Sequence, residues 1–166
     1  MKEQTPAEIV SLKHGGGGQA YHRLVREVFL PAFDNPFLRE LNDSAVMETA
    51  GGHIAMTTDS YVVQPRFFPG GDIGRLAVCG TVNDLAMSGA EPKYLTCGMI
   101  IEAGFPLAEL RRIAESMAAA AREAGVYIVS GDTKVVEKGA CDGLYINTAG
   151  FGAFTLRLRP GAYLAQ

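Results

Sequence analysis

Two long stretches of the chain carry apolar residues at helical spacing. In residues 19–33 they are Tyr21, Leu24, Val25, Val28 and Phe29, with Pro31 near the end. The second stretch follows Phe105-Pro106 and is closed by Gly125, and its apolar stripe comprises Leu107, Leu110, Ile113, Ala114, Met117 and Ala121. Both patterns predict amphipathic helices.

Strand patterns lie around these helices. Residues 45–49 and 53–58 flank the connector 50–52, whose two glycines favour a hairpin, and residues 61–63 extend the β region. A third helical stretch is expected at 72–88, where Asp72 itself stands as the N-cap.

Three further strands are predicted in the second half of the chain. Residues 93–102 are rich in apolar and β-favouring types, residues 126–130 read as a buried strand, and residues 144–154 alternate. The resulting order of elements mixes hairpins with crossover connections. We therefore expect an α+β fold in which helices cover an open mixed β-sheet.

Length and composition limit the class of protein. The 166 residues, 48% of them hydrophobic, suit one domain, and no repeat or charged linker divides them. Lys and Arg number 15 against 18 Asp and Glu, without a basic block, which argues against nucleic-acid binding. No apolar run has the roughly 18 residues that span a bilayer, and the start lacks a signal-peptide pattern. We expect a cytoplasmic protein that does not enter membranes.

Four aspartates form the main chemical signal. Asp43 precedes the first strand, Asp59 and Asp132 come just after predicted strands, and Asp84 lies within a helix. Because a triphosphate would be repelled by carboxylates, the four argue for about two Mg²⁺ ions that bridge protein and phosphate. The alternative is that Asp43 and Asp59 are turn or cap residues.

Segment 67–90, FFPGGDIGRLAVCGTVNDLAMSGA, joins a glycine turn to a helix start. Gly70 and Gly71 allow a tight turn with free amide groups before Asp72, so an anion is expected near that helix end. Asn83 follows on the helix and offers a hard oxygen ligand of the kind Mg²⁺ prefers. The alternative is a capped helix with a surface carboxylate.

Further candidates surround a second glycine run and the predicted strand at 126–130. Gly15, Gly16, Gly17 and Gly18 could close over phosphates or form a flexible linker, and the adjacent His14 is a candidate phosphate donor or general acid-base. The spacing matches neither a P-loop nor a GxGxxG motif.

Lys134, two residues after Asp132, could neutralise charge in a transition state or move a proton. Its alternative is a solvated lysine on a strand edge. Glu102, at the end of the strand predicted at 93–102, is a weaker candidate acid-base.

Several motifs together resemble the HypE family of hydrogenase maturation factors over nearly the whole chain. They are HGGGG near the start, TTDSYVV, FFPGGDIGRLAVCGTVNDLAMSGA, IIEAG, SGDTKVV and INTAGFG. That family is similar to aminoimidazole ribonucleotide synthetase, selenophosphate synthetase and thiamine monophosphate kinase. The resemblance implies an α+β N-terminal domain whose sheet closes into a barrel across a homodimer.

The resemblance also implies a site for ATP and Mg²⁺. Asp43, Asp59, Asp84 and Asp132 would hold metal and phosphate, and Asn83, Asp72 and the Gly15–Gly18 loop would surround them. Relatives often show paired acids where this chain has Asn42-Asp43.

The implied reaction is an ATP-dependent dehydration of a carbamoyl group on a C-terminal cysteine. The product is a thiocyanate that supplies cyanide to NiFe hydrogenase, with Lys134 or Glu102 as the base. The implied partners are a carbamoyltransferase and a scaffold complex.

The chain departs from the family in length. The family's second domain and cysteine tail are absent, and Cys79, Cys97 and Cys141 do not lie at a mobile terminus, so we expect a fragment without turnover of its own. Two alternatives stay open: another ATP-dependent phosphotransfer enzyme of the same superfamily, and a non-catalytic dimerisation or docking module.

Overall fold

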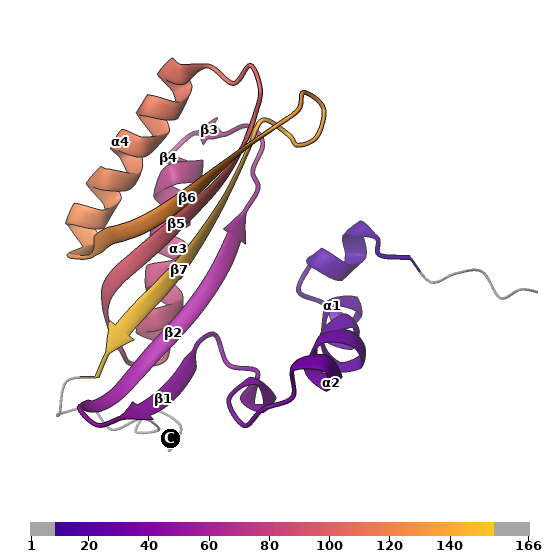
Figure 1. Ribbon diagram of the computed structural model, residues 1–166, viewed down its shortest axis with the longest axis vertical. Coiled ribbons are helices and arrows are strands. Elements are labelled where there is room, and N and C mark those ends of the chain that lie inside the picture. Colours follow the sequence, from indigo (N-terminus) through magenta and orange to yellow (C-terminus); the bar gives the residue numbers. More distant parts are fainter. Residues whose placement is uncertain (1–8, 155–166) are drawn as a thin grey trace, which may run out of the picture. The chain divides into compact units, whose positions relative to one another are not determined.

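The computed structural model describes residues 9–154, and its contacts divide the chain into two compact units between Leu41 and Asn42 (Figure 1). The first unit is helical. The second contains a mixed β-sheet and two long helices. The predicted α+β class is confirmed.

The first unit is built around one helical stretch. Helix α1 (Gln19–Leu24), the π-helical turn η2 (Val25–Phe29) and α2 (Leu30–Phe33) follow one another without a break, as predicted for residues 19–33. The wider π turn lies directly before Pro31, which lacks the N–H that an α-helix would use. The 3-10 helices η1 (Leu12–Gly15) and η3 (Leu38–Glu40) lie on either side.

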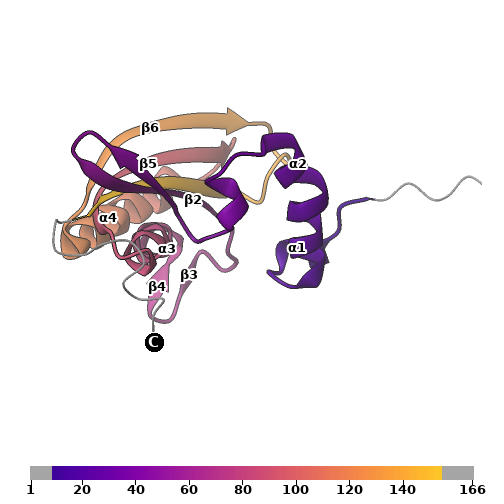
Figure 2. The same cartoon turned by 90° about the horizontal axis from the view of Figure 1, so that it is seen from below.

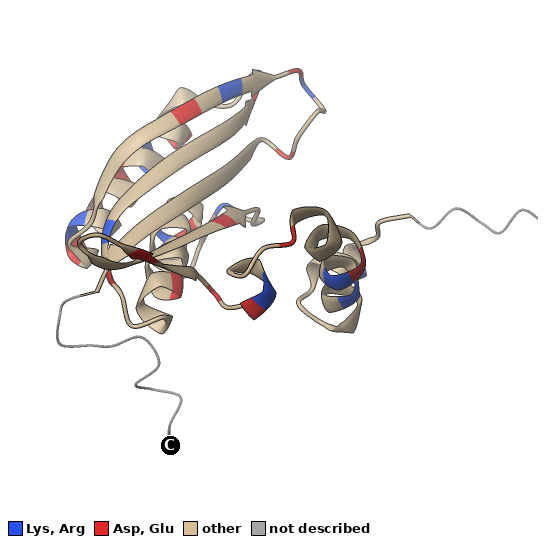
Figure 3. Cartoon of the chain, turned by 60° about the horizontal axis from the view of Figure 1, so that its bottom comes forward, with Lys and Arg blue, Asp and Glu red and all other residues tan. Residues whose placement is uncertain are grey.

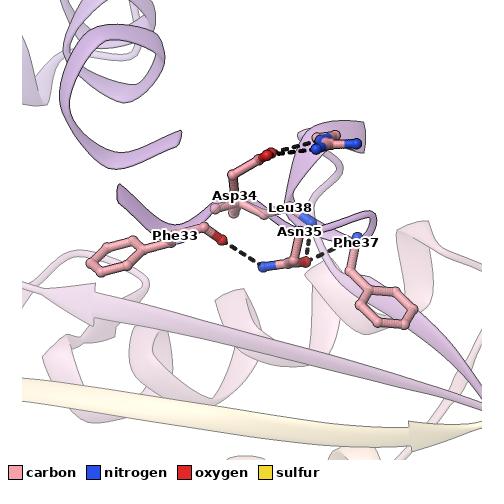
Figure 4. Close-up of polar contacts among 6 residues, drawn as sticks. Phe33, Asp34, Asn35, Phe37 and Leu38 are labelled. Atoms are coloured by element: carbon pink, nitrogen blue, oxygen red, sulfur yellow. Dashed lines mark hydrogen bonds and ion pairs between the residues drawn. The ribbon is translucent and has the colours of Figure 1, made fainter. Parts of the chain in front are cut away.

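A side-chain turn ends this helical stretch (Figure 4). The Asn35 Oδ1 atom accepts hydrogen bonds from the backbone N–H groups of Phe37 and Leu38, both at 3.0 Å, while its Nδ2 donates to the carbonyl of Phe33. Arg39 forms a two-pronged ion pair with Asp34. Asparagine thus replaces the missing helical bonds and reverses the chain.

The second unit is a five-stranded sheet in the order β1-β2-β7-β5-β6 (Figures 1 and 2). The strands are β1 (Ala45–Thr49), β2 (Gly52–Tyr61), β5 (Glu91–Glu102), β6 (Tyr127–Val136) and β7 (Leu144–Ala153). Only β5 and β6 are parallel within this sheet, and a helix connects them. The strands β3 (Phe67–Phe68) and β4 (Gly71–Asp72) form a separate hairpin.

Two helices, α3 (Ile73–Met87) and α4 (Leu107–Ala124), cover one face of the sheet (Figure 2). The core lies between these helices and the sheet. Its largest fully buried apolar side chains are Ile73, Leu85, Leu95, Ile113, Leu144, Ile146 and Val78. Gly125 ends α4 in the left-handed region, at φ 69°, which confirms the predicted cap. The face away from the helices exposes apolar side chains that include Met56, Tyr94 and Ile100.

Strand β6 differs from its prediction as a short buried strand at 126–130. It continues to Val136, and nine of its ten residues are exposed because it is the edge of the sheet and pairs only with β5. Gly131 lies inside the strand, where a Cβ atom would stand 2.6 Å from the carbonyl oxygen of Cys97. Asp132 and Lys134 therefore lie within a strand rather than after it.

Candidate functional site

Two of the four predicted aspartates contact Thr57 of β2, Asp43 through its backbone carbonyl and Asp84 through its carboxylate, and Asp59 lies on the same strand. The Thr57 hydroxyl lies 2.8 Å from the carbonyl oxygen of Asp43 and 3.3 Å from Oδ2 of Asp84, which comes from α3. Asp59 lies two residues further along β2, on the same face as Thr57. We call Asp43, Asp59 and Asp84 the acidic cluster.

The electrostatics of the acidic cluster disfavour three negative charges. Partial burial raises the pKa of Asp84, the Thr57 hydroxyl opposes that rise, and the charges of Asp59 and Asp43 add to it. The charges of Asp43 and Asp59 thus raise the pKa of Asp84, whereas a bound cation would lower it. Elsewhere the charged residues are mostly on helices and loops, and the strands carry few (Figure 3).

Asp132 lies apart from the acidic cluster. It pairs with Gly98 of β5, which pairs with the exposed Asn147 of β7. The next residue, Thr148, is fully buried, pairs with Asp59 and donates to a carbonyl of α3. Because residues paired across strands share a face and neighbours alternate, Asp132 is on the open face and Asp59 on the helix face. Strands β7 and β5 also separate them.

The four aspartates thus do not converge within one copy of this chain. Among residues 9–154, no three His, Cys, Asp or Glu side chains lie close enough to hold a single metal ion. The donor chemistry of the acidic cluster nevertheless fits Mg²⁺, which is usually held by one or two carboxylates together with substrate phosphates. The metal roles of the four aspartates remain predictions.

The Asp72 carboxylate is used in hydrogen bonds within the protein. Its Oδ1 accepts hydrogen bonds from the N–H groups of Gly74 (2.8 Å) and Arg75 (3.0 Å), and its Oδ2 accepts one from the Ser116 hydroxyl of α4 at 2.6 Å. The predicted N-cap is confirmed. Both carboxylate oxygens are engaged, and a rise of 1.5 Å per residue places the two ends of α3 about 20 Å apart. A contact between Asp72 and a nucleotide remains a prediction.

Asn83 is exposed on α3, next to Asp84 in sequence. It is therefore at the acidic-cluster end of the helix rather than at the Asp72 end. Its amide remains a predicted ligand to a cation or nucleotide.

The two predicted bases lie on the open face, away from the acidic cluster. Glu102 alternates with the buried Ile101, and its carboxylate accepts a hydrogen bond from the N–H of Gly139 in the loop after β6. Lys134 pairs with Ile100 and is exposed. Glu102 thus anchors a loop, and Lys134 is the more available of the two.

The glycine run belongs to the first unit. Gly15 ends η1, Gly18 is the N-cap of α1, and Gly17 adopts a φ of 71° that favours glycine. Nδ1 of His14 lies 3.0 Å from the backbone nitrogen of Ser11 and 3.1 Å from both its hydroxyl and its carbonyl oxygen.

A hollow of about 630 Å³ lies in the first unit, and its lining includes Lys13, His14, Gln19 and Arg23. The lining mixes these polar and basic side chains with apolar ones. The catalytic role of His14 and the phosphate role of the glycines remain predictions.

Sequence reasoning missed the hydroxyl groups of the site. Thr57 stands at its centre, and Tyr61, Thr81 and Thr148 form a buried hydroxyl network behind Asp59. The alternation of TTDSY offered a signal, because Thr57, Asp59 and Tyr61 share one face of a strand. Their contacts with α3 could not be inferred from that alternation.

A family model for "AIR synthase related protein, N-terminal domain" matches residues 41–154. The chain therefore belongs to this family of N-terminal domains.

Within the family the chain is similar to the carbamoyl dehydratase HypE of Rhizobium leguminosarum bv. viciae, with 58% identity over 143 residues. The match covers 86% of this chain and 41% of the relative. The resemblance to HypE is confirmed.

Solved structures support the same relationship. A HypE–HypF complex matches with a TM-score of 0.74 at 58% identity, covering 79% of this chain and 42% of that one. HypE in complex with ATP matches with a TM-score of 0.62 at 54% identity, covering 92% and 48%. The chain thus spans less than half the length of these proteins.

Among residues 9–154, no helix combines the length and the apolar character that crossing a membrane requires.

Proposed function

We propose that this chain is the nucleotide-binding half of an ATP-dependent carbamoyl dehydratase that acts in NiFe hydrogenase maturation. Identity above 50% to HypE proteins, one of them solved with ATP, supports the assignment. The observation that carries it is the acidic cluster, in which the pKa of Asp84 is raised by burial and by two neighbouring carboxylates. Such an arrangement is typical of sites that bind cations.

In this proposal Asp43, Asp59 and Asp84 hold Mg²⁺, with Asn83 beside them. Mg-ATP would transfer its terminal phosphoryl group to the carbamoyl oxygen with release of ADP, and loss of that oxygen as inorganic phosphate would leave the C–N triple bond. The glycine run Gly15–Gly18 contacts phosphate through its backbone N–H groups. Lys134, exposed on β6, is the proposed base, and its neutral amine would accept a proton from the carbamoyl nitrogen.

The substrate cysteine is supplied from outside residues 9–154. Cys97 is buried in the sheet, Cys141 is half-buried in a loop, and Cys79 is exposed but held on α3. None of the three is placed to reach a nucleotide and then leave it, as a carrier must. The chain alone is therefore proposed to bind Mg-nucleotide without turning over a carbamoyl group.

A homodimer is also part of the proposal. The open face of the sheet exposes Met56, Tyr94 and Ile100, with 41–48% of each side chain accessible. Pairing of two such faces would bury them, as the barrel of the related proteins implies. Asp132 and Lys134 also lie on this face, so the proposed dimer places them at the interface with the second copy. Hydrogenase maturation proteins, including a carbamoyltransferase, are the proposed partners in the cytoplasm.

Titration calorimetry with Mg-ATP, run beside static light scattering, tests this function. We expect saturable heat that depends on Mg²⁺ and that reports a weaker affinity in Asp84→Asn. A dimer that gives no heat with Mg-ATP would favour a docking module instead, for which the exposed apolar face of the sheet is the supporting observation.

A further inference from the structure

Helix α3 differs in surface chemistry from α4, its neighbour on the same face of the sheet (Figure 2). Within Ile73–Met87 the only charged residues are Arg75 and Asp84. Helix α4 carries charges at five of its exposed positions, which are Arg111, Arg112, Glu115, Arg122 and Glu123. A surface helix normally presents a polar face to solvent, and a helix that is apolar all round is normally covered.

Two sides of α3 are occupied within the second unit. One side meets the sheet, where the Thr148 hydroxyl of β7 donates to the carbonyl of Ala77 at 3.0 Å. Another side meets α4, where Nη1 of Arg75 donates to Oε2 of Glu123 at 2.7 Å. The charge of Arg75 is thus directed at α4. The remaining side of α3 faces outward.

This outward side of α3 carries an uncharged stripe. Its members follow one another at helical spacing and are the exposed residues of the helix: Leu76, Cys79, Asn83, Ala86 and Met87. Leu76 is 40% exposed and Met87 is 67% exposed. At a rise of 1.5 Å per residue the stripe is about 16 Å long. We call it the α3 stripe, and only Asn83 in it is polar, as is typical of a contact surface.

The comparisons indicate what covers the α3 stripe. The match reaches 41% of the R. leguminosarum HypE and 48% of the HypE solved with ATP, so more than half of each relative lies outside it. The homodimer proposed above uses the open face, on the other side of the sheet from α3 (Figure 2). A second copy bound there would leave the stripe accessible. The remaining half of a HypE-type protein is therefore the occupant that these observations favour.

We propose that the α3 stripe is the surface on which the second half of a full-length HypE-type protein docks. The inference deepens the proposed function, on which it rests, because Asp84 directly follows Asn83 of the stripe. Docking would bury Leu76 and Met87 and would place the second half beside the acidic cluster.

The thiol of Cys79 reports whether the stripe is covered. Cys79 is exposed, whereas Cys97 is buried and Cys141 is half-buried. Maleimide labelling, assigned by mass spectrometry of peptides, should be rapid at Cys79 in the 166-residue chain. It should be at least about tenfold slower once the chain is extended by the part of R. leguminosarum HypE that follows the match. Cys141 lies outside the stripe and is the internal control, which should label equally in both proteins.

Substitutions in the stripe test the contact itself. In the extended chain, Leu76→Asp combined with Met87→Asp should restore rapid labelling of Cys79, because two carboxylates are costly to bury without partners. The matched control is Leu107→Asp, since this leucine of α4 is 77% exposed and lies outside the stripe. It should leave Cys79 protected.

Full-length R. leguminosarum HypE provides a second measurement, which holds even if the extended chain does not fold. Aspartates at its positions matched to Leu76 and Met87 should lower its urea midpoint. The same two changes should leave the urea midpoint of the 166-residue chain unaltered, because both side chains are exposed there. Equal effects in the two proteins would overturn the proposal.

The labelling experiment has other outcomes that contradict docking. Equal reactivity of Cys79 in the chain and in its extension would show that the second half lies elsewhere. Protection in the 166-residue chain that grows with protein concentration would assign the stripe to a second copy instead. Calorimetry with Mg-ATP tests the nucleotide site independently: no heat together with a protected Cys79 would remove the nucleotide role and retain the docking surface.

Discussion

The two ends of α3 carry aspartates in opposite electrostatic situations. At the N-terminal end, the Asp72 carboxylate accepts three hydrogen bonds, two from backbone N–H groups and one from Ser116. Near the C-terminal end, Asp84 has a single weak bond from Thr57, at 3.3 Å, and faces two other carboxylates. The first aspartate is satisfied by the fold. The second is only weakly satisfied by the fold and is crowded by like charges.

This contrast separates a carboxylate that the fold satisfies from one that it leaves crowded by like charges. A carboxylate whose oxygens are engaged by the protein stabilises the native state, because its removal leaves donors without partners. A carboxylate crowded by like charges opposes folding unless a cation neutralises it. Substitutions at the two ends of α3 should therefore affect stability and binding in opposite proportions.

The largest expected change in stability is that of Asp72→Ala. It removes the N-cap of α3 and the bond to Ser116, and should lower the free energy of unfolding by about 1–3 kcal/mol. Mn²⁺ affinity at the acidic cluster should not change. Urea denaturation measures the loss, and Asp72→Asn is the matched control because asparagine also caps helices. Equal stability of Asp72→Ala and the unaltered chain would contradict the structural role.

Asp84→Asn should show the reverse pattern. We expect Mg-ATP to bind about tenfold more weakly or worse, the size of effect that changes around metal sites commonly produce. The free energy of unfolding should stay within about 0.5 kcal/mol or rise, because the substitution relieves repulsion from Asp43 and Asp59. Calorimetry and urea denaturation give the two values. A large loss of stability in Asp84→Asn would point to a structural aspartate.

A smaller effect should appear in the dependence of stability on pH. Since the pKa of Asp84 is raised in the folded chain, the folded state binds its proton more tightly than the unfolded state. This contribution to stability is present below the ordinary carboxyl pKa of 3.8 and is lost as pH rises through the raised value.

Urea midpoints measured across that range, with and without Mg²⁺, provide the test. The fall in stability should be shallower with the cation present and should be missing in Asp84→Asn. An identical dependence of stability on pH in the unaltered chain and in Asp84→Asn would contradict a raised pKa of Asp84.

The smallest effect is expected for Asp132→Asn, which sharpens the comparison between the two faces of the sheet. Within one chain this exposed side chain is remote from the acidic cluster, so stability should change by less than about 0.5 kcal/mol. Mg-ATP affinity should fall only at protein concentrations at which light scattering shows a dimer. A fall of equal size in the monomer would mean that Asp132 reaches the cluster of its own chain.

Local patterns in the sequence predicted most elements of the fold. Helical periodicity, the Asp72 cap and the Gly125 cap indicated where helices begin and end, because these signals involve residues only a few positions apart. The alternation of residues 144–154 likewise indicated β7. The exposure of β6 was not predictable in this way, because it depends on which strand forms the edge of the sheet.

The sequence by itself determined the family, the α+β class and the set of candidate carboxylates, since motifs and residue types are local properties. Only the tertiary structure decided that Thr57 contacts both Asp43 and Asp84, that Asp132 lies on the opposite face of the sheet from Asp59, and that Asp72 also bonds to Ser116 of α4. The reason is geometric. Strand order and the alternation of the pleat determine which distant side chains share a face, and neither can be read from any single segment.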